Sequence, residues 1–337
     1  MKKVNELKKR VSRPIKVMQI GEGNFLRAFV DYGIDVANEE LGFNSNVAVI
    51  VPISGKPARF ANQDNIYTVC LRGQKDGKPF KEDRIVTCVE KVLGAYEDYE
   101  EFMALARLDA LEFVVSNTTE AGIVYEAGDK LGDCPPNTYP VELIDHNGEN
   151  LKKCVMQYVD LWKLEDGFRN WLDKDCIFAS TLVDRIVTGY PRAEAAKMCE
   201  ELGYDDELLD QAEPFGLWVI GDARVADKFH VSTDKWHVEF TDKIEIFKER
   251  KVRILNGAHT SMVLGAYLAG FDYVGQCMAD PAVRAQLDQS VYGEIVPTVH
   301  MPKEKAEKSL CMSGLRHAEY YGMQEVFDGL YAKSSKN

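Results

Sequence analysis

The sequence predicts an α/β fold, in which a doubly wound parallel sheet with an antiparallel elaboration precedes a mainly α-helical C-terminal domain. A strand, a glycine turn, a helix and a second strand occupy residues 15–51, and a β-rich hairpin occupies residues 66–92. From Glu249 onward the pattern is helical. The length of 337 residues predicts two domains, because a domain takes roughly 150 residues. We place them at residues 1–247 and 248–337.

The composition is that of an acidic globular protein. Lysine and arginine number 41 against 54 aspartates and glutamates, which gives a formal net charge of −13. Because lysine and arginine hold nucleic acids and anionic membranes, we expect neither as a partner. The chain contains no run of about 18 apolar residues, and this predicts that no helix spans a membrane.

The cysteines and the start of the chain indicate a reducing compartment. The basic first residues lack the apolar core of a signal peptide. The 8 cysteines form no Cys-x-x-Cys motif and no zinc-like spacing with histidine. We therefore expect reduced thiols, a cytoplasmic protein and no metal site.

The first strand, turn and helix predict a parallel sheet. Ile15–Ile20 is a short continuous apolar run, which is typical of a strand buried on both faces. Gly21 and Gly23 follow, and apolar residues then recur near helical period as far as Leu41. Asn46–Val51 is a second strand of the buried type. This βαβ unit implies a right-handed crossover.

The next segments predict a hairpin and alternating helices and strands. Ile66–Arg72 and Phe80–Val92 are rich in β-formers and flank Asp76-Gly77, a pair that suits a tight turn. Further along, the pattern predicts helices over Tyr96–Arg107, Leu151–Leu161, Gly167–Leu172 and Pro191–Leu202. It predicts strands over Glu112–Ser116, Phe215–Ile220 and Trp236–Ile246. The segment Ile177–Val187 mixes β-formers with Asp184 and Arg185.

The glycine turn is the first candidate site. Glycines between a strand and a helix let backbone N–H groups approach a diphosphate at the helix N-terminus. Leu26 stands where the usual third glycine would be, and Arg27 lies one turn into the helix, where it could reach a phosphate. The alternative is an ordinary strand–helix turn with a solvated Arg27.

The residues near this turn only weakly distinguish NAD from NADP. No acid ends the second strand, where the ribose of NAD is usually bound, because Val51 is followed by Pro52. Glu22 and Asp31 near the turn disfavour an additional negative charge. We therefore expect NAD, without the extra phosphate of NADP.

Lys251, Asn256 and His259 form the second candidate site. On an α-helix, Asn256 lies about 140° and His259 about 80° from Lys251, so the three share one broad face. A lysine can exchange a proton with an alcohol oxygen, while an amide and an imidazole hold that oxygen. The alternative is a solvated lysine on a charged helix start, with the other two side chains satisfied by neighbours.

These motifs, with two further segments, resemble a known family. The four segments are Gly21–Phe29 (GEGNFLRAF), Ser116–Ile123 (SNTTEAGI), Ser180–Arg192 (STLVDRIVTGYPR) and Lys248–Thr260 (KERKVRILNGAHT). Together they resemble the polyol-specific long-chain dehydrogenase/reductase family, also called the mannitol dehydrogenase group. The resemblance runs from about residue 14 to about residue 305 and implies a Rossmann-type N-terminal domain, followed by a helical C-terminal domain that is shortened in this chain.

The resemblance also implies roles for single residues. It places the family's general acid/base on Lys251, and its oxygen-holding amide and imidazole on Asn256 and His259. The remaining correspondences are the glycine-turn signature at Gly21, Gly23, Asn24 and Phe25, the nicotinamide side at Thr119 and Glu120, and the Val-Asp-Arg-Ile stretch near the active site at Asp184 and Arg185.

The expected reaction is a metal-independent hydride transfer between NADH and a small sugar acid. Arg185 or Arg192 could pair with the substrate carboxylate through two hydrogen bonds. The alternative for Arg185 is an ion pair with Asp184 within the fold. For the whole chain, the alternatives are a related polyol or sugar-acid substrate, and a cofactor-binding short form with impaired catalysis.

Overall fold

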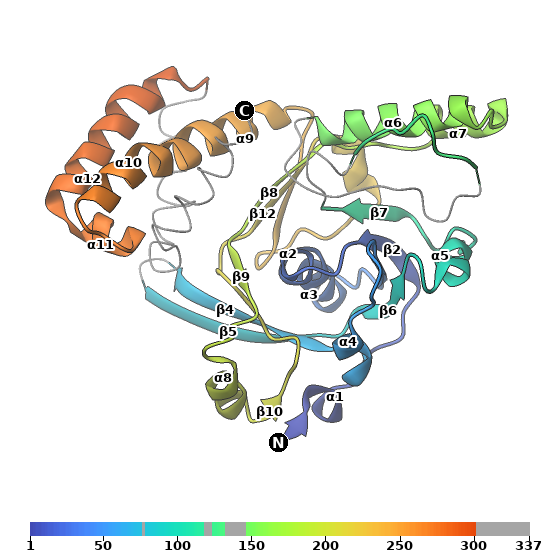
Figure 1. The fold of residues 1–337 in the computed structure, drawn as a ribbon, viewed down its shortest axis with the longest axis horizontal. Helices are drawn as coiled ribbons and strands as arrows, with labels where there is room; N and C mark the ends of the chain where they lie inside the picture. The colour runs from blue at the N-terminus through green and yellow to red at the C-terminus, as the bar shows by residue number, and fades with distance from the viewer. Residues whose placement is uncertain (76–77, 118–122, 132–145, 301–337) are drawn as a thin grey trace.

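The computed structural model describes residues 1–75, 78–117, 123–131 and 146–300, and Figure 1 shows their arrangement. The centre of the N-terminal part is a four-stranded parallel sheet, and its order is β6-β3-β2-β7. Its strands are β2 (Ile15–Ile20), β3 (Asn46–Val51), β6 (Val89–Gly94) and β7 (Phe113–Ser116). In chain order these are the third, second, first and fourth strands, which is the order of a dinucleotide-binding half.

The first two strands have the bounds that the sequence predicts. Every residue of β3 is buried, as its unbroken apolar run requires. The helix between them runs continuously from Asn24 to Glu40 as α2 (Asn24–Leu26), a π-helical turn (Arg27–Asp31) and α3 (Tyr32–Glu40). In Figure 1 it is seen nearly end-on, between the parallel sheet and strands β8, β9 and β12.

The predicted hairpin is present, but its second strand is shorter than expected. β4 (Tyr67–Lys75) and β5 (Lys78–Val86) pair antiparallel. The chain then turns at Thr87, whose N–H and hydroxyl both donate to Asp35 Oδ1 at 2.9 and 3.0 Å. The segment predicted as one run, Phe80–Val92, therefore contributes to two sheets, because a buried carboxylate from α3 separates β5 from β6.

Three further sheets and a set of helices surround this centre. β11 (Asp210–Ala212) joins β4 to β9 (Val187–Gly189), and β12 (Leu217–Ile220) lies between β8 (Thr181–Asp184) and β13 (His237–Phe240). The remaining elements are β1 (Lys2–Lys3), which pairs with β10 (Tyr204–Asp205), and helices α1 (Val4–Leu7), α4 (Ala58–Asn62), α5 (Tyr99–Leu105), α6 (Asn147–Leu161), α7 (Asp166–Lys174) and α8 (Ala195–Leu202).

Two predicted elements have different bounds in the structure. The helix predicted from Pro191 begins at Ala195, because the carbonyl of Pro191 accepts from Glu194 and Ala195 in a turn that precedes the helix. The strand predicted over Trp236–Ile246 ends at Phe240, and a helix begins at Ile244.

The C-terminal part is helical throughout its described length. It contains α9 (Ile244–Glu249), a π-helical turn (Arg250–Asn256), α10 (Gly257–Leu268), α11 (Val274–Ala279), α12 (Pro281–Asp288), a second π-helical turn (Gln289–Ile295) and a short 3-10 turn (Val296–Thr298). It has its own apolar core, which includes Ile254, Met262 and Leu287. The predicted domain boundary at residue 248 falls within α9 and stays a prediction. None of the described helices combines the length and apolar character needed to cross a membrane.

An aromatic cluster joins the helix after the glycine turn to the sheet formed by β8, β12 and β13. Phe29 packs edge-on against Trp236 and Trp218, with ring centroids 4.5 and 5.7 Å apart. Trp236 is fully buried, and its indole occupies the space beside Gly33 in α3. The helix can approach Trp236 this closely because Gly33 has no side chain.

We expect Gly33→Ala to destabilise the protein although alanine is the better helix former. The added Cβ would lie 2.2 Å from Trp236 Nε1, and such overpacking costs about 2 kcal/mol. Thermal denaturation checks this, with Gly128→Ala as the control, because a Cβ there meets no atom within 4 Å. Equal melting temperatures for the two variants would contradict this packing.

Candidate active site

The glycine turn has the geometry of an anion-binding turn. Gly21 has a φ of +114°, a conformation that only glycine adopts without strain. Its N–H donates to the carbonyl of Ile50 at 2.8 Å, which extends the pairing of β2 with β3. Within the described chain, the N–H groups of Glu22 and Gly23 donate to no protein atom. They precede a long helix at Asn24, so the turn fits a diphosphate.

The sheet order places this turn where the order of the strands reverses. β2 and β7 are neighbours, and Ile20 pairs with Ser116 at their carboxyl ends. The strand order reverses between them, and open α/β sheets bind their ligands at that point. Gly21 follows one strand and Asn117 the other. Thr119 and Glu120, predicted on the nicotinamide side, lie outside the described residues.

Asn24 and Phe25 support the turn from within. The side-chain oxygen of Asn24 accepts from the guanidinium of Arg27. Its amide lies against Gly189, where an added Cβ would be 2.2 Å from Asn24 Nδ2. The ring of Phe25 stacks on Phe29 at 4.9 Å. Both predicted residues therefore contact the protein interior and hold the turn in place.

Arg27 is also directed inward, away from the position where a phosphate would bind. Its side chain is 1% exposed, Nη1 donates to the carbonyl of Leu208 at 2.6 Å, and Nη2 lies 3.4 Å from Asp210 Oδ2. The guanidinium also covers the ring of Tyr67 at 5.2 Å. With these partners Arg27 holds the fold together, and we do not retain it as a phosphate contact.

Lys251 lies on a π-helical turn and contacts strand β8. Its Nζ donates to the carbonyl of Val183 at 2.5 Å and lies 3.6 Å from Asp184 Oδ1. The side chain as a whole is 22% exposed, so these contacts hold the ammonium on a side chain that is not fully buried. In a π-helical turn the hydrogen bonds join residues five apart. Lys251 and Asn256 are therefore about one turn apart, closer to a common face than an α-helix would place them.

The other two predicted catalytic residues follow on the same continuous helix. Asn256 is the last residue of the π-helical turn and is exposed. His259 Nδ1 lies 2.9 Å from the carbonyl of Leu255. Because a carbonyl only accepts, Nδ1 carries the hydrogen, and in the neutral ring Nε2 is then an acceptor for a hydroxyl.

Asp184 and Arg185 have separate partners. Asp184 lies beside Lys251, and its charge also acts on the half-buried guanidinium of Arg250, whose pKa is lowered chiefly by burial. Arg185 is buried and donates to the carbonyls of Ala28 and Glu213 at 2.7 to 3.0 Å. With its donors used in this way, Arg185 does not reach a substrate carboxylate.

The structure does not bring Arg192 to the catalytic helix. Its side chain is exposed, and it lies between β9 and α8. In Figure 1, α8 lies at the lower edge of the molecule, whereas α9 and α10 lie at the upper edge. Of the two arginines that the sequence suggested for the substrate carboxylate, neither Arg185 nor Arg192 therefore lies beside Lys251.

Two features of the site escaped the sequence analysis. One is the carbonyl of Val183, a backbone acceptor that no side-chain motif indicates. The other is Gly189, whose φ of +78° and contact with Asn24 require glycine. The second had a signal in the sequence, since a glycine within a strand often marks close approach of another segment.

Acidic side chains surround the loop after β3. Glu97 Oε1 accepts from the N–H of Gly55 at 2.7 Å, and Asp98 Oδ2 pairs with Lys56 Nζ at 2.7 Å. The ribose-binding end of a dinucleotide site lies beyond this strand. No acidic residue directly follows β3 in the sequence, but the fold brings Glu97 there from the connection between β6 and α5.

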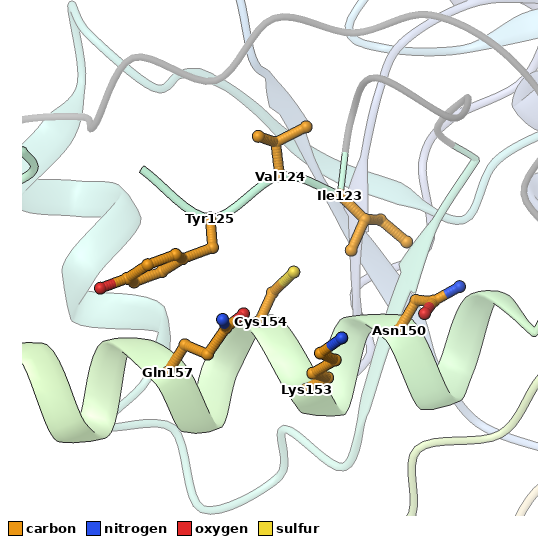
Figure 2. A pocket seen from close by; sticks show the side chains of 7 residues that line it. All are labelled: Ile123, Val124, Tyr125, Asn150, Lys153, Cys154 and Gln157. Atoms are coloured by element: carbon orange, nitrogen blue, oxygen red, sulfur yellow. The ribbon is translucent and has the colours of Figure 1, made fainter. Parts of the chain in front are cut away.

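A hollow lies apart from these residues. Figure 2 shows it between residues 123–125 and α6, with Cys154 pointing from the helix toward that segment. Its volume is about 360 Å³, and its lining contains none of the residues predicted from the sequence. Among the residues that the structure describes, no group of three or more His, Cys, Asp or Glu is placed to hold a metal ion.

Comparison with known proteins gives a consistent result. Two family models match the chain: the mannitol dehydrogenase Rossmann domain over residues 15–232 and the mannitol dehydrogenase C-terminal domain over residues 243–311. The altronate oxidoreductases of Shigella flexneri and Escherichia coli O157:H7 are each 42% identical to the chain. The match covers 87% of this chain and 67% of each relative.

Two solved structures share the fold. The crystal structure of D-sorbitol dehydrogenase in substrate-free form has a TM-score of 0.73 at 18% identity and covers 94% of this chain and 75% of that one. The Pseudomonas fluorescens mannitol 2-dehydrogenase, a ternary complex with NAD and D-mannitol, has a TM-score of 0.71 at 20% identity, covering 94% and 71%. At these identities the likeness concerns the fold, and it confirms the predicted fold class.

Two buried carboxyl groups behind the glycine turn make stability depend on pH. Burial raises the pKa of Asp31 to about 7, although hydrogen bonds from Tyr67 and Gln19 oppose the shift. Burial likewise raises the pKa of Asp210 to about 7, against the opposing charge of Arg27. A carboxyl whose folded pKa is raised stabilises the fold below its unfolded pKa, and this contribution is lost as pH rises through the folded value.

We expect Asp31→Asn to flatten the decline in melting temperature between about pH 4 and about pH 7, because between its unfolded and folded pKa values Asp31 is ionised only in the unfolded chain, and the variant lacks this carboxyl. Asp98→Asn is the matched control, since a hydrogen bond from Lys56 lowers the pKa of Asp98 and its titration is centred below this window. If the melting temperatures of the wild type and of Asp31→Asn fall equally steeply with pH, Asp31 does not titrate near neutrality.

Proposed function

The chain belongs to the mannitol dehydrogenase family, and we propose that it reduces tagaturonate to altronate with NADH. The resemblance that the four sequence segments indicated is confirmed. Family membership makes the chain an oxidoreductase that uses a nicotinamide cofactor. The choice of substrate and of NADH is the proposal, and the names of the altronate oxidoreductases support the substrate.

The position of Lys251 Nζ is the observation that carries the proposed chemistry. The ammonium is held by the carbonyl of Val183 and by Asp184, and 22% of the Lys251 side chain is exposed. In a carbonyl reduction, the carbon receives a hydride and the oxygen receives a proton. NADH, when bound, supplies the hydride. Lys251 holds the proton that the oxygen needs, and Asp184 keeps the ammonium in one direction.

Asn256 and His259 complete the proposed substrate-binding group, in which Asn256 donates to the carbonyl oxygen and His259 accepts from a hydroxyl instead of holding that oxygen. The exposed amide of Asn256 can donate to the substrate carbonyl oxygen. His259, with Nδ1–H bonded to Leu255, presents Nε2 as an acceptor for a substrate hydroxyl. Of the three residues suggested near the substrate, Asp184, Arg185 and Arg192, we retain only Asp184, which lies beside Lys251.

We propose NAD as the cofactor because of the acids around the loop after β3. Glu97 contacts the N–H of Gly55 in that loop, and a carboxylate near the ribose repels a 2′-phosphate. Glu22 adds a further acid at the turn. We also propose a cytoplasmic location, since the six described cysteines are all free thiols.

An assay of NADH oxidation tests the function directly. We expect the highest kcat/KM with tagaturonate, compared with fructuronate and fructose as the substrates of related activities. A higher kcat/KM with either of the others would replace the proposed substrate. NADH binding without oxidation of any of the three would instead indicate a cofactor-binding protein with impaired catalysis.

Lys251→Ala is expected to lower kcat by about a thousandfold, because the proton donor is lost. Its Kd for NADH should stay within about twofold of the wild type, since Lys251 contacts strand β8 and not the glycine turn. Lys243→Ala, an exposed lysine just before α9, is the control and should retain turnover. Equal loss of turnover and NADH affinity in Lys251→Ala would contradict the assigned role.

We expect the wild type to bind NADH at least about tenfold more tightly than NADPH, a difference of about 1.4 kcal/mol. Glu97→Gln should narrow this ratio by strengthening NADPH binding, because it removes a charge near the ribose. Glu101→Gln, which changes an exposed acid on α5, is the control. Fluorescence titration with both cofactors checks this, and an unchanged ratio in Glu97→Gln would remove Glu97 from the specificity site.

A further inference from the structure

Gln19 is a buried polar side chain at the carboxyl end of β2. It is 0% exposed, and its Nε2 lies 3.2 Å from the carbonyl oxygen of Gly21 and 3.5 Å from Asp31 Oδ2. Burial of an amide costs free energy unless it is hydrogen-bonded. These two acceptors therefore determine where the amide of Gln19 points.

Asp31 is itself fixed from several elements. Tyr67 on β4 donates to Asp31 Oδ2 at 2.7 Å, and the thiol of Cys88 donates to the carbonyl of Asp31 at 3.3 Å. The charges of Arg27 and Asp35 also act on the Asp31 carboxyl, with opposite sign. The anchor of Gln19 is thus part of the core and not a mobile surface group.

The hydrogen bond from Gln19 holds the carbonyl of Gly21, and with it the peptide group that joins Gly21 to Glu22. On one side, the N–H of Gly21 is bonded to Ile50. On the other side, its carbonyl accepts from Gln19. The described peptide bonds are all trans, and in a trans peptide the C=O and the following N–H point in opposite directions. A Gly21 carbonyl drawn toward Gln19 therefore turns the N–H of Glu22 to the other side, away from the core.

We propose that Gln19 is a positioning residue for the cofactor diphosphate, which it serves by holding the Gly21 carbonyl so that the N–H of Glu22 faces the ligand. This inference rests on the proposed function, because it assumes that the turn binds a dinucleotide. Gln19 does not touch the ligand and acts through Gly21. Its contribution is to organise the turn before the ligand binds, which lowers the cost of binding.

The chain offers a matched control for this role. Gln63 is also buried, and its Nε2 also joins a backbone carbonyl, that of Ile66 at 2.6 Å, to a buried carboxylate, Asp206 at 2.7 Å. Neither of these partners belongs to the glycine turn. Replacing each glutamine with methionine, which has a similar length and no N–H, separates loss of a buried hydrogen bond from loss of the turn's orientation.

Binding of NADH to the full chain is the first test. We expect Gln19→Met to raise the Kd for NADH about fivefold, the equivalent of one hydrogen bond of about 1 kcal/mol, with a rise in KM for NADH larger than the fall in kcat. Gln63→Met should lower the melting temperature and leave the Kd within about twofold. Equal changes of Kd in the two variants would overturn the inference.

Hydrogen exchange of the ligand-free protein is the second test, and it separates this inference from the proposed function. We expect Gln19→Met, but not Gln63→Met, to speed exchange of the Gly21 N–H that is bonded to Ile50. If the wild type binds NADH while Gln19→Met changes neither Kd nor exchange, the inference is wrong and the proposed function stands. If the wild type binds no NADH, the proposed function is wrong, and the role of Gln19 in cofactor binding is wrong with it.

Discussion

Three consecutive residues, Val183 to Arg185, contact both halves of the candidate active site. The carbonyl of Val183 and the carboxylate of Asp184 hold the ammonium of Lys251. Arg185 donates to the carbonyl of Ala28, in the helix that follows the glycine turn. Asp184 is the last residue of strand β8 and Arg185 follows it directly, so this short segment can hold the two groups at once. The placement of the proton donor relative to the cofactor turn therefore depends on the end of strand β8 and on Arg185, the residue that follows it.

Buried charge makes this arrangement rigid. Arg185 covers the rings of Tyr32 and Trp236 at 4.7 and 5.1 Å, and its guanidinium donates to backbone carbonyls on two different elements. Arg27, on the helix itself, donates to the carbonyl of Leu208 and pairs with the carboxylate of Asp210. A buried charge that loses a partner costs several kcal/mol. The helix after the glycine turn therefore cannot shift without leaving one of these arginines unpaired.

Local patterns were sufficient to predict the parts of the site that depend on local structure. The bounds of β2 and β3, and the glycine turn between strand and helix, follow from short apolar runs and a conformation that needs glycine. The spacing of Lys251, Asn256 and His259 placed them on one helix, which the structure contains. The π-helical turn at Lys251 was not predicted, because the sequence analysis placed these residues at the angular spacing of a regular α-helix.

Partners that come from distant segments account for the remaining differences. A helical arginine after a glycine turn suits a phosphate as well as it suits the core, and only the contacts of Arg27 with Leu208 and Asp210 decide between them. In the same way, Arg185 and Asp184 are adjacent in sequence but are bonded to different elements. Glu97 became relevant to cofactor choice only because the fold brings it beside Gly55.

A crystal structure with NADH and tagaturonate tests the central claim most directly. It should show the diphosphate bonded to the N–H groups of Glu22 and Gly23, with Lys251 Nζ within hydrogen-bonding distance of the substrate carbonyl oxygen while Asp184 remains beside it. A diphosphate bound elsewhere, or an ammonium of Lys251 directed away from the substrate oxygen, would contradict the link that strand β8 provides.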